Sequence, residues 1–172
     1  NWQSLEAQLV DICDEMAYIS ADLEDAFRGE YITWKDLEEN ELCTQVIQQI
    51  SKSENGFNFT QPNLSPSKLN HQLLHVLIQT LIQDSQKNIK NFPPLTPKTP
   101  KRNSNIPYLQ SENRLIEFNQ ENEKKFLDLK TFLYKNFYEL PEIQSHTNQG
   151  QKVISNIFDH LLLNPDKIPT DF

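Results

Sequence analysis

Apolar residues recur at intervals of three and four along most of this sequence, and that spacing limits the fold more than any other feature. Between residues 69 and 82, seven leucines and isoleucines follow it. Such spacing places apolar side chains on one face of an α-helix, whose period is about 3.6 residues. The 172 residues include ten prolines but only three glycines, which favours long helices joined by proline-containing loops over a sheet. We therefore predict an all-α fold, a bundle of helices.

Five helices are expected from this spacing and from the residues that begin and end each run. The first helix ends at Gly29, and Thr33 is the expected cap of the second, whose first turns carry acidic residues. Pro141 stops the fourth helix, and Pro165 follows the fifth. The predicted helices span residues 3–28, 33–51, 67–89, 119–138 (or from 112) and 150–164.

Two segments rich in polar residues and proline interrupt the helices. Residues 53–67 form one expected loop, and residues 91–111 form a flexible Pro-rich insertion with a basic cluster. In the insertion, Thr96 and Thr99 each precede a proline beside basic residues, a pattern that could accept phosphate or bind an acidic partner. A solvated linker is the favoured interpretation of the same residues. We predict that residues 1–172 form a single helical domain.

The net charge of −8 and the distribution of apolar residues argue against several classes of protein. A nucleic-acid binder would carry the opposite sign, a membrane span needs about 20 apolar residues, and no signal-peptide pattern opens the chain. Cys13 and Cys43 lie in helical patterns without metal-binding spacing, so we interpret them as buried free thiols of a reducing compartment. We predict a cytoplasmic protein that binds neither nucleic acid nor membrane.

The first predicted helix has two apolar sides. Val10, Ala17 and Ala21 form a side of small residues that suits the close approach of another helix. We expect a helix packed on two sides to line a cleft with its third. The larger apolar stripe comprises Leu5, Leu9, Ile12, Met16, Ile19, Leu23 and Phe27.

An acidic ridge occupies the remaining side of this helix. Asp11, Asp14, Tyr18, Asp22 and Asp25 follow one another at steps of three, four, four and three residues. A solvated face is the usual explanation of such a ridge. No lysine or arginine interleaves this one, however, and a phenol lies among its carboxylates. Crowded carboxylates repel one another unless a cation or a substrate hydroxyl joins them, so a site for a hard metal ion or for sugar hydroxyls is the alternative interpretation.

Residues 4–29, SLEAQLVDICDEMAYISADLEDAFRG, also resemble a known motif. The run is similar to the last metal-binding motif of the deoxynucleoside triphosphate triphosphohydrolases, the dGTPase-like branch of the HD-domain phosphohydrolases. The likeness lies in LEAQ at 5–8, DEMAY at 14–18 and ADLED at 21–25. The resemblance implies that this chain is the C-terminal part of an all-α HD-domain phosphohydrolase, so we expect a fragment of a longer protein.

Two later segments are similar to the helices that close the phosphohydrolase-associated region of the same family. They are DLKTFLYKNFYELPEI at 128–143 and NQGQKVISNIFDHLLLNPDKIP at 148–169. Each is weak alone, but both occur in the expected order. The resemblance therefore covers most of the chain outside the predicted loops and implies that residues 112–172 are the associated C-terminal helices.

The resemblance implies roles for three residues of the ridge. Asp14 would complete the H…HD…D set that binds a divalent metal, Mg²⁺ or Mn²⁺ or another transition metal. Tyr18 would contact the deoxyribose and help to exclude a 2′-hydroxyl, and Asp22 would accept a hydrogen bond from the 3′-hydroxyl. Steps of four residues place these groups on one helical face. Solvated or helix-pairing roles are expected for Asp11 and Asp25.

The chain departs from the family pattern because the upstream H…HD residues are missing. None of its four histidines, His71, His75, His146 and His160, is followed by aspartate. His71 and His75 are one helical turn apart but lack an HExxH context, so polar edge or core histidines are favoured over a zinc site. No catalytic residue is expected in this segment, which we expect to be inactive alone.

For the complete enzyme, the resemblance implies hydrolysis of a dNTP to a deoxynucleoside and inorganic triphosphate. The metal would polarise the α-phosphate and position the nucleophile. The dNTP is thus the expected ligand, and a homo-oligomer built through helical contacts is the expected assembly. A catalytically inactive regulatory or oligomerisation module is the alternative, and the presence or absence of an upstream H…HD motif would discriminate between the two.

Overall fold

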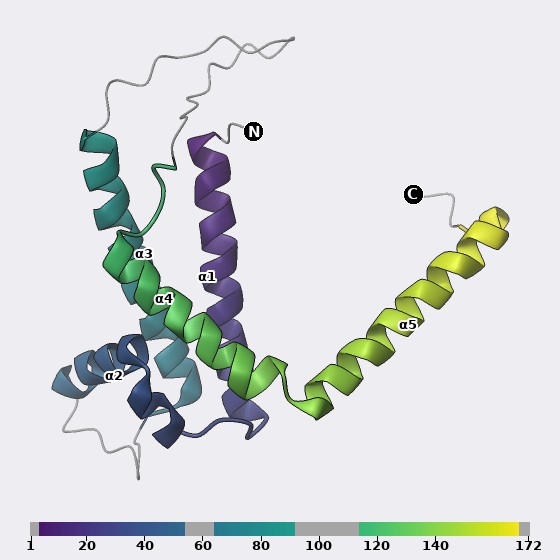
Figure 1. The fold of residues 1–172 in the computed structure, drawn as a ribbon, viewed down its shortest axis with the longest axis horizontal. Coiled ribbons are helices and arrows are strands. Elements are labelled where there is room, and N and C mark those ends of the chain that lie inside the picture. The colour runs from purple at the N-terminus through teal and green to yellow at the C-terminus, as the bar shows by residue number, and fades with distance from the viewer. Residues whose placement is uncertain (1–3, 54–63, 92–113, 169–172) are drawn as a thin grey trace, which may run out of the picture. The chain divides into compact units, whose positions relative to one another are not determined.

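The computed structural model describes residues 4–53, 64–91 and 114–168 (Figure 1). Within these ranges the chain forms helices and helical turns without a β-strand, which confirms the predicted all-α fold. None of the described helices is long and apolar enough to cross a membrane. Residues 54–63 of the expected loop at 53–67, and residues 92–111 of the Pro-rich insertion with Thr96 and Thr99, lie outside the described residues. The expected loop bounds are too wide, because residue 53 and residues 66–67 are helical.

The first helix, α1 (Leu5–Arg28), agrees closely with its prediction. The Ser4 hydroxyl caps its start by accepting a hydrogen bond from the Ala7 N–H at 3.2 Å. Gly29 ends it, and the Gly29 N–H donates to the Asp25 carbonyl at 2.8 Å. A side chain at position 29 would overlap the present position of the Tyr31 ring.

The predicted second helix is instead two elements, so its expected boundaries are wrong. A 3₁₀ helix, η1 (Lys35–Glu39), is followed by α2 (Glu41–Ser53). The buried Asn40 separates them because its Oδ1 accepts the Cys43 N–H at 3.0 Å and so caps α2. Thr33 is not the cap; its N–H and its hydroxyl both donate to Asp36 at 2.7 Å.

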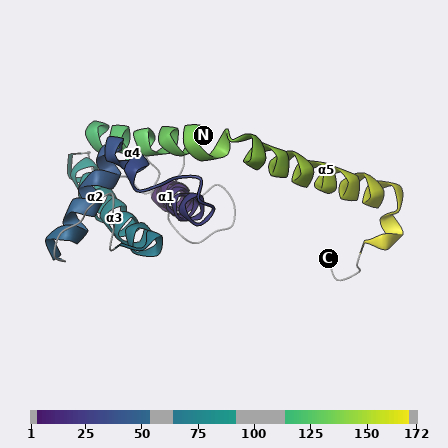
Figure 2. The same ribbon diagram turned by 90° about the horizontal axis from the view of Figure 1, so that it is seen from below.

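Four helices pack together in the first of two compact units, residues 1–133. The third is α3 (Pro66–Asn91) and the fourth is α4 (Gln120–Leu133). Figures 1 and 2 show α4 lying across α1, and both α1 and α2 contact α3 and α4. Side chains one turn apart fill the core, as the periodicity predicted: Ile12, Met16, Ile19 and Leu23 on α1, Leu69, Leu73, Leu77 and Leu81 on α3, and Phe126, Leu129 and Leu133 on α4.

The small-residue side of α1 does not behave as predicted. Val10 is 67% exposed, and Ala17 and Ala21 are exposed as well. None of the described helices covers this side, so the expectation that α1 is packed on two sides is wrong for the described part of the chain.

The second compact unit, residues 134–172, is built around one long helix. A π turn (Tyr134–Tyr138) follows α4, where the sequence predicted that the α-helix would continue. The next helix, α5 (Pro141–Leu163), begins nine residues before the predicted start at Gly150, because Pro141 both ends the preceding turn and fits the first position of a new helix. A short 3₁₀ turn, η3 (Pro165–Lys167), ends the described chain.

Both cysteines are free thiols. Cys13 is half-buried, and Cys43 is fully buried in α2. Burial raises the pKa of the Cys43 thiol to about 12, so it is an unreactive core residue. The predicted burial is therefore confirmed for Cys43 but not for Cys13. The cytoplasmic location stays a prediction.

Candidate functional site

Part of the acidic ridge of α1 opens onto a surface hollow of about 470 Å³. Asp11, Asp14 and Tyr18 line it together with Glu15 and Arg114. Asp14 and Tyr18 are one helical turn apart, so a carboxylate and a phenol stand about 6 Å apart along the helix axis. The structure therefore brings together two of the three predicted site residues on the wall of one concave surface.

The remaining ridge residues lie beyond the hollow. Asp22 is half-buried one turn after Tyr18 and is not part of the lining. Asp25 is exposed, in keeping with the solvated role expected for it. A ligand that reached Asp14, Tyr18 and Asp22 would have to extend along α1 past the end of the hollow.

Cations from distant parts of the chain reach two of the carboxylates in the hollow. Arg114 Nη2 lies 3.4 Å from Asp11 Oδ2, across more than a hundred residues of sequence. Lys130 Nζ of α4 forms an ion pair with the Glu15 carboxylate on α1. The α1 sequence showed no basic residue interleaved with the ridge. The structure supplies the compensating charges from other elements, and no local pattern could have revealed them.

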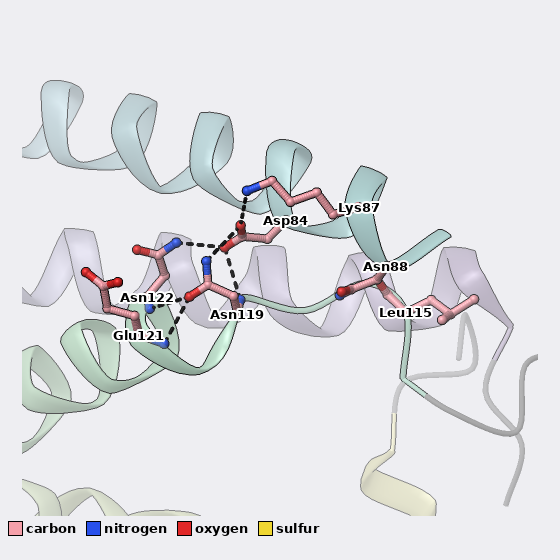
Figure 3. Close-up of polar contacts among 7 residues, drawn as sticks. All are labelled: Asp84, Lys87, Asn88, Leu115, Asn119, Glu121 and Asn122. Carbon is pink, nitrogen blue, oxygen red and sulfur yellow. Dashed lines mark hydrogen bonds and ion pairs between the residues drawn. The ribbon is translucent and has the colours of Figure 1, made fainter. Parts of the chain in front are cut away.

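The segment that follows Arg114 is held against α1 by hydrogen bonds to a buried side chain. Gln8 is 2% exposed, and its Oε1 accepts the N–H of Leu115 at 2.9 Å and of Ile116 at 3.2 Å. Asn88 Nδ2 of α3 donates to the Leu115 carbonyl at 3.3 Å (Figure 3). The backbone next to Arg114 is therefore fixed to the same helix that carries Asp14 and Tyr18.

A second polar cluster, around Asp84 of α3, is structural (Figure 3). Asp84 is 2% exposed and accepts hydrogen bonds from Asn119 N–H at 3.0 Å, Asn119 Nδ2 at 2.9 Å and Asn122 Nδ2 at 2.7 Å. Asn119 Oδ1 in turn accepts the N–H of Glu121 and of Asn122, which caps the start of α4. Burial acts to raise the pKa of Asp84, but hydrogen bonds from Asn119, Asn122 and Lys87 outweigh it, and the pKa is lowered.

The described residues contain no group of three or more His, Cys, Asp or Glu side chains that could hold a metal ion. His71 and His75 are exposed on α3, and His146 and His160 are exposed on α5. Asp14 nevertheless offers a hard carboxylate oxygen of the kind that Mg²⁺ and Mn²⁺ prefer. It can supply one ligand of a metal site whose other ligands come from elsewhere.

Comparisons with known proteins find similarity to phosphohydrolases along the chain. Residues 116–172 match the model of the phosphohydrolase-associated domain. A deoxyguanosinetriphosphate triphosphohydrolase-like protein of Leptospira interrogans is 28% identical over all of this chain and 43% of its own length. Like-named proteins of Bartonella quintana and Nitrosomonas europaea are 26% and 27% identical over 96% and 98% of this chain. The resemblance to the dGTPase-like family is confirmed.

The chain spans less than half the length of these dGTPase-like relatives: 43%, 38% and 42% of the proteins named. The family-model match begins close to the predicted start of the associated region at residue 112 and covers α4 and α5. The helix α1, with Asp14, Tyr18 and Asp22, lies outside that match but within the similarity to the dGTPase-like relatives, which covers the whole chain.

Proposed function

We propose that this chain is the C-terminal part of a metal-dependent dNTP triphosphohydrolase, inactive alone, which converts a dNTP and water to a deoxynucleoside and inorganic triphosphate. The observation that carries the proposal is that Asp14 and Tyr18 line one hollow on α1. The names of the relatives support the reaction class. The missing metal ligands would come from the part of the protein that the relatives possess and this chain does not cover.

In this proposal Asp14, Tyr18 and Asp22, which form a column along one face of α1, each have one task. Asp14 holds a divalent cation, Mg²⁺ or Mn²⁺ or another transition metal, which when bound supplies Lewis-acid polarisation of the α-phosphate. Tyr18 packs its ring against the deoxyribose where a 2′-hydroxyl would otherwise lie. Asp22 accepts a hydrogen bond from the 3′-hydroxyl. The sugar oxygen is the leaving group of the reaction at the α-phosphate. Residues that bind the sugar are therefore expected close to Asp14, which would hold the metal.

The direct test is to incubate the full-length protein with each dNTP and Mg²⁺ or Mn²⁺ and to identify the products. We expect inorganic triphosphate and deoxynucleoside in equal amounts. Release of pyrophosphate or monophosphate instead would show that another bond is cleaved and would contradict the proposal. A gene without an H…HD motif upstream of this segment would also contradict it.

Tyr18→Ala is expected to reduce the discrimination between dNTP and NTP substrates by about tenfold, measured as the ratio of their kcat/KM values. The ring is 59% exposed in the hollow and would exclude the 2′-hydroxyl by its bulk, an effect worth about 1–3 kcal/mol. Tyr18→Phe should keep the discrimination if bulk decides it. Tyr134→Ala, which removes a tyrosine of equal exposure in the second unit, is the control. Unaltered discrimination in Tyr18→Ala would reject the sugar-contacting role.

One observation favours a second function, that of an association module. The long helix α5 carries an apolar stripe whose side chains are mostly exposed, with Ile154 at 69% and Ile157 at 55%. Gly150 lies in the same stripe, and a Cβ added there would meet nothing within 4 Å. A glycine inside a helix costs about 0.5–1 kcal/mol, and no contact with the described residues requires it. The stripe comprises Ile143, Gly150, Val153, Ile154, Ile157, Phe158 and Leu161.

We propose that a second copy of α5 covers this stripe and gives the homo-oligomer. Ile143 and Ile157 lie seven residues on either side of Gly150. An antiparallel crossing at Gly150 therefore sets each Ile143 opposite the other copy's Ile157, and the missing side chain lets the two backbones approach. The bulky C-terminal half of each stripe then faces the smaller N-terminal half of the other. Such an assembly is compatible with the enzyme as well as with an inactive module.

Ile157→Asp is expected to convert the assembly to monomers at micromolar concentration, because two carboxylates would be buried in an apolar contact. Sedimentation velocity measures the change. Asn156→Asp adds the same charge on the other side of α5 and should leave the assembly intact. A wild-type protein that is monomeric throughout, or an Ile157→Asp variant that still assembles, would contradict the role given to α5.

A further inference from the structure

Arg114 is the one cationic side chain among the described residues that line the hollow at Asp14. Its side chain is 49% exposed, and its partner Asp11 is 59% exposed. The contact of 3.4 Å is longer than the 2.7–2.9 Å typical of a strong charge-assisted hydrogen bond. Exposed ion pairs of this kind contribute little, so the guanidinium can exchange Asp11 for another anion at low cost.

The base of the Arg114 side chain, by contrast, is held firmly. The next residue, Leu115, is fully buried, and its backbone is bound from two helices, by Gln8 of α1 and Asn88 of α3. Buried hydrogen bonds of this type fix a backbone because breaking one leaves an unsatisfied polar group. The structure therefore combines a fixed attachment point with a guanidinium that can change acceptors, in the hollow that Asp14 also lines.

The other charged side chains that line the hollow are Asp11, Asp14 and Glu15, of which Glu15 is paired with Lys130. A triphosphate is strongly negative and would be repelled by these carboxylates unless cations offset them. A divalent cation at Asp14 would do so on one side. The planar guanidinium, whose paired N–H groups match phosphate oxygens in geometry, can do so on the other.

We propose that Arg114 binds the triphosphate group of a nucleotide held at Asp14, exchanging the Asp11 carboxylate for phosphate oxygens. This rests on the proposed function for the identity of the ligand. It adds a substrate-binding residue from a segment a hundred residues away from the α1 motif. It also gives Asp11 a role, because its carboxylate competes with the substrate for the same guanidinium.

The test measures binding of inorganic tripolyphosphate and, separately, of a deoxynucleoside to the full-length protein with Mg²⁺, by calorimetry. Arg114→Ala should weaken tripolyphosphate binding about 10–100-fold and leave deoxynucleoside binding unchanged. Arg114→Lys should fall between the two, and Asp11→Asn should tighten tripolyphosphate binding severalfold because the competing charge is gone. Arg28→Ala, which removes an arginine paired with Glu24 elsewhere on α1, is the control.

The outcomes separate this inference from the proposed function. Unchanged tripolyphosphate affinity in Arg114→Ala, with a wild-type protein that hydrolyses dNTPs, overturns the role of Arg114 alone. Equal losses for tripolyphosphate and deoxynucleoside show a merely structural role and overturn it too. Arg114-dependent tripolyphosphate binding without dNTP hydrolysis supports the role of Arg114 and contradicts the reaction. A wild-type protein that neither binds tripolyphosphate nor hydrolyses dNTPs overturns both.

Discussion

Replacing Asp14 by alanine should lower dNTP hydrolysis by the full-length protein more than about 100-fold. Loss of a residue that only orients a metal ligand typically costs 10–100-fold, so loss of a ligand itself should cost at least the upper value. The measurement is the rate of triphosphate release with saturating Mg²⁺ or Mn²⁺, together with the metal content of the purified protein. Both should fall in the variant.

A loss of activity in this variant can be separated from a loss of stability, because Asp14 is exposed on the wall of a surface hollow. Surface substitutions usually change stability by less than about 0.5 kcal/mol, so the variant should unfold at the same temperature as the wild type. Asp25→Ala removes another exposed aspartate of the same ridge, outside the hollow, and should retain full activity. Undiminished triphosphate release in Asp14→Ala would remove Asp14 from the metal site.

The largest effect on stability is expected at Asp84. Asp84→Ala should lower the free energy of unfolding by about 3 kcal/mol, because it deprives Asn119 and Asn122 of their shared acceptor and α4 of its attachment to α3. Urea unfolding followed by circular dichroism measures the change. Asp128→Ala, an exposed aspartate on α4, is the control and should be nearly neutral. A loss below about 1 kcal/mol at Asp84 would show that the cluster does not hold the two helices together.

The same cluster predicts a dependence on pH. The pKa of Asp84 is lowered in the folded protein from an ordinary value of 3.8, so its charged form contributes stability above that value. This contribution should be lost as the pH falls from about 3.8 through the lower folded-state pKa. Because other carboxyl groups titrate in the same range, the quantity to measure is the difference in stability between wild type and Asp84→Asn. That difference should shrink as the pH falls, and a constant difference would contradict the assignment.

Regular spacing explains why the helices themselves could be predicted. Apolar residues at steps of three and four group Met16 of α1 and Leu73 of α3 with the other buried side chains of their helices. Breaks inside helical patterns were harder to foresee. Asn40 ends one run and caps the next through a single side-chain hydrogen bond, and many asparagines in helical sequences make no such bond. The continuous helix expected over residues 33–51 was wrong for that reason.

The candidate site was predicted only in part, because its parts come from distant segments. The column of Asp14, Tyr18 and Asp22 lies on one helix, so periodicity was sufficient to group it. Arg114 reaches the same hollow only because Gln8 fastens the following backbone to α1. Nothing in the residues around Arg114 shows this. The exposure of Val10 was missed for the related reason that an apolar side chain does not show which neighbour, if any, covers it.

The attachments at the two ends of residues 115–119 have a consequence for how this protein can vary. Gln8 holds one end of this short segment and Asp84 holds the other, so its position is set by α1 and α3. The stretch of sequence between α3 and Arg114 therefore does not determine where Arg114 and α4 lie. Related proteins can lengthen, shorten or rewrite that stretch while keeping the same register in everything that follows, since extra residues in a connection cost little free energy.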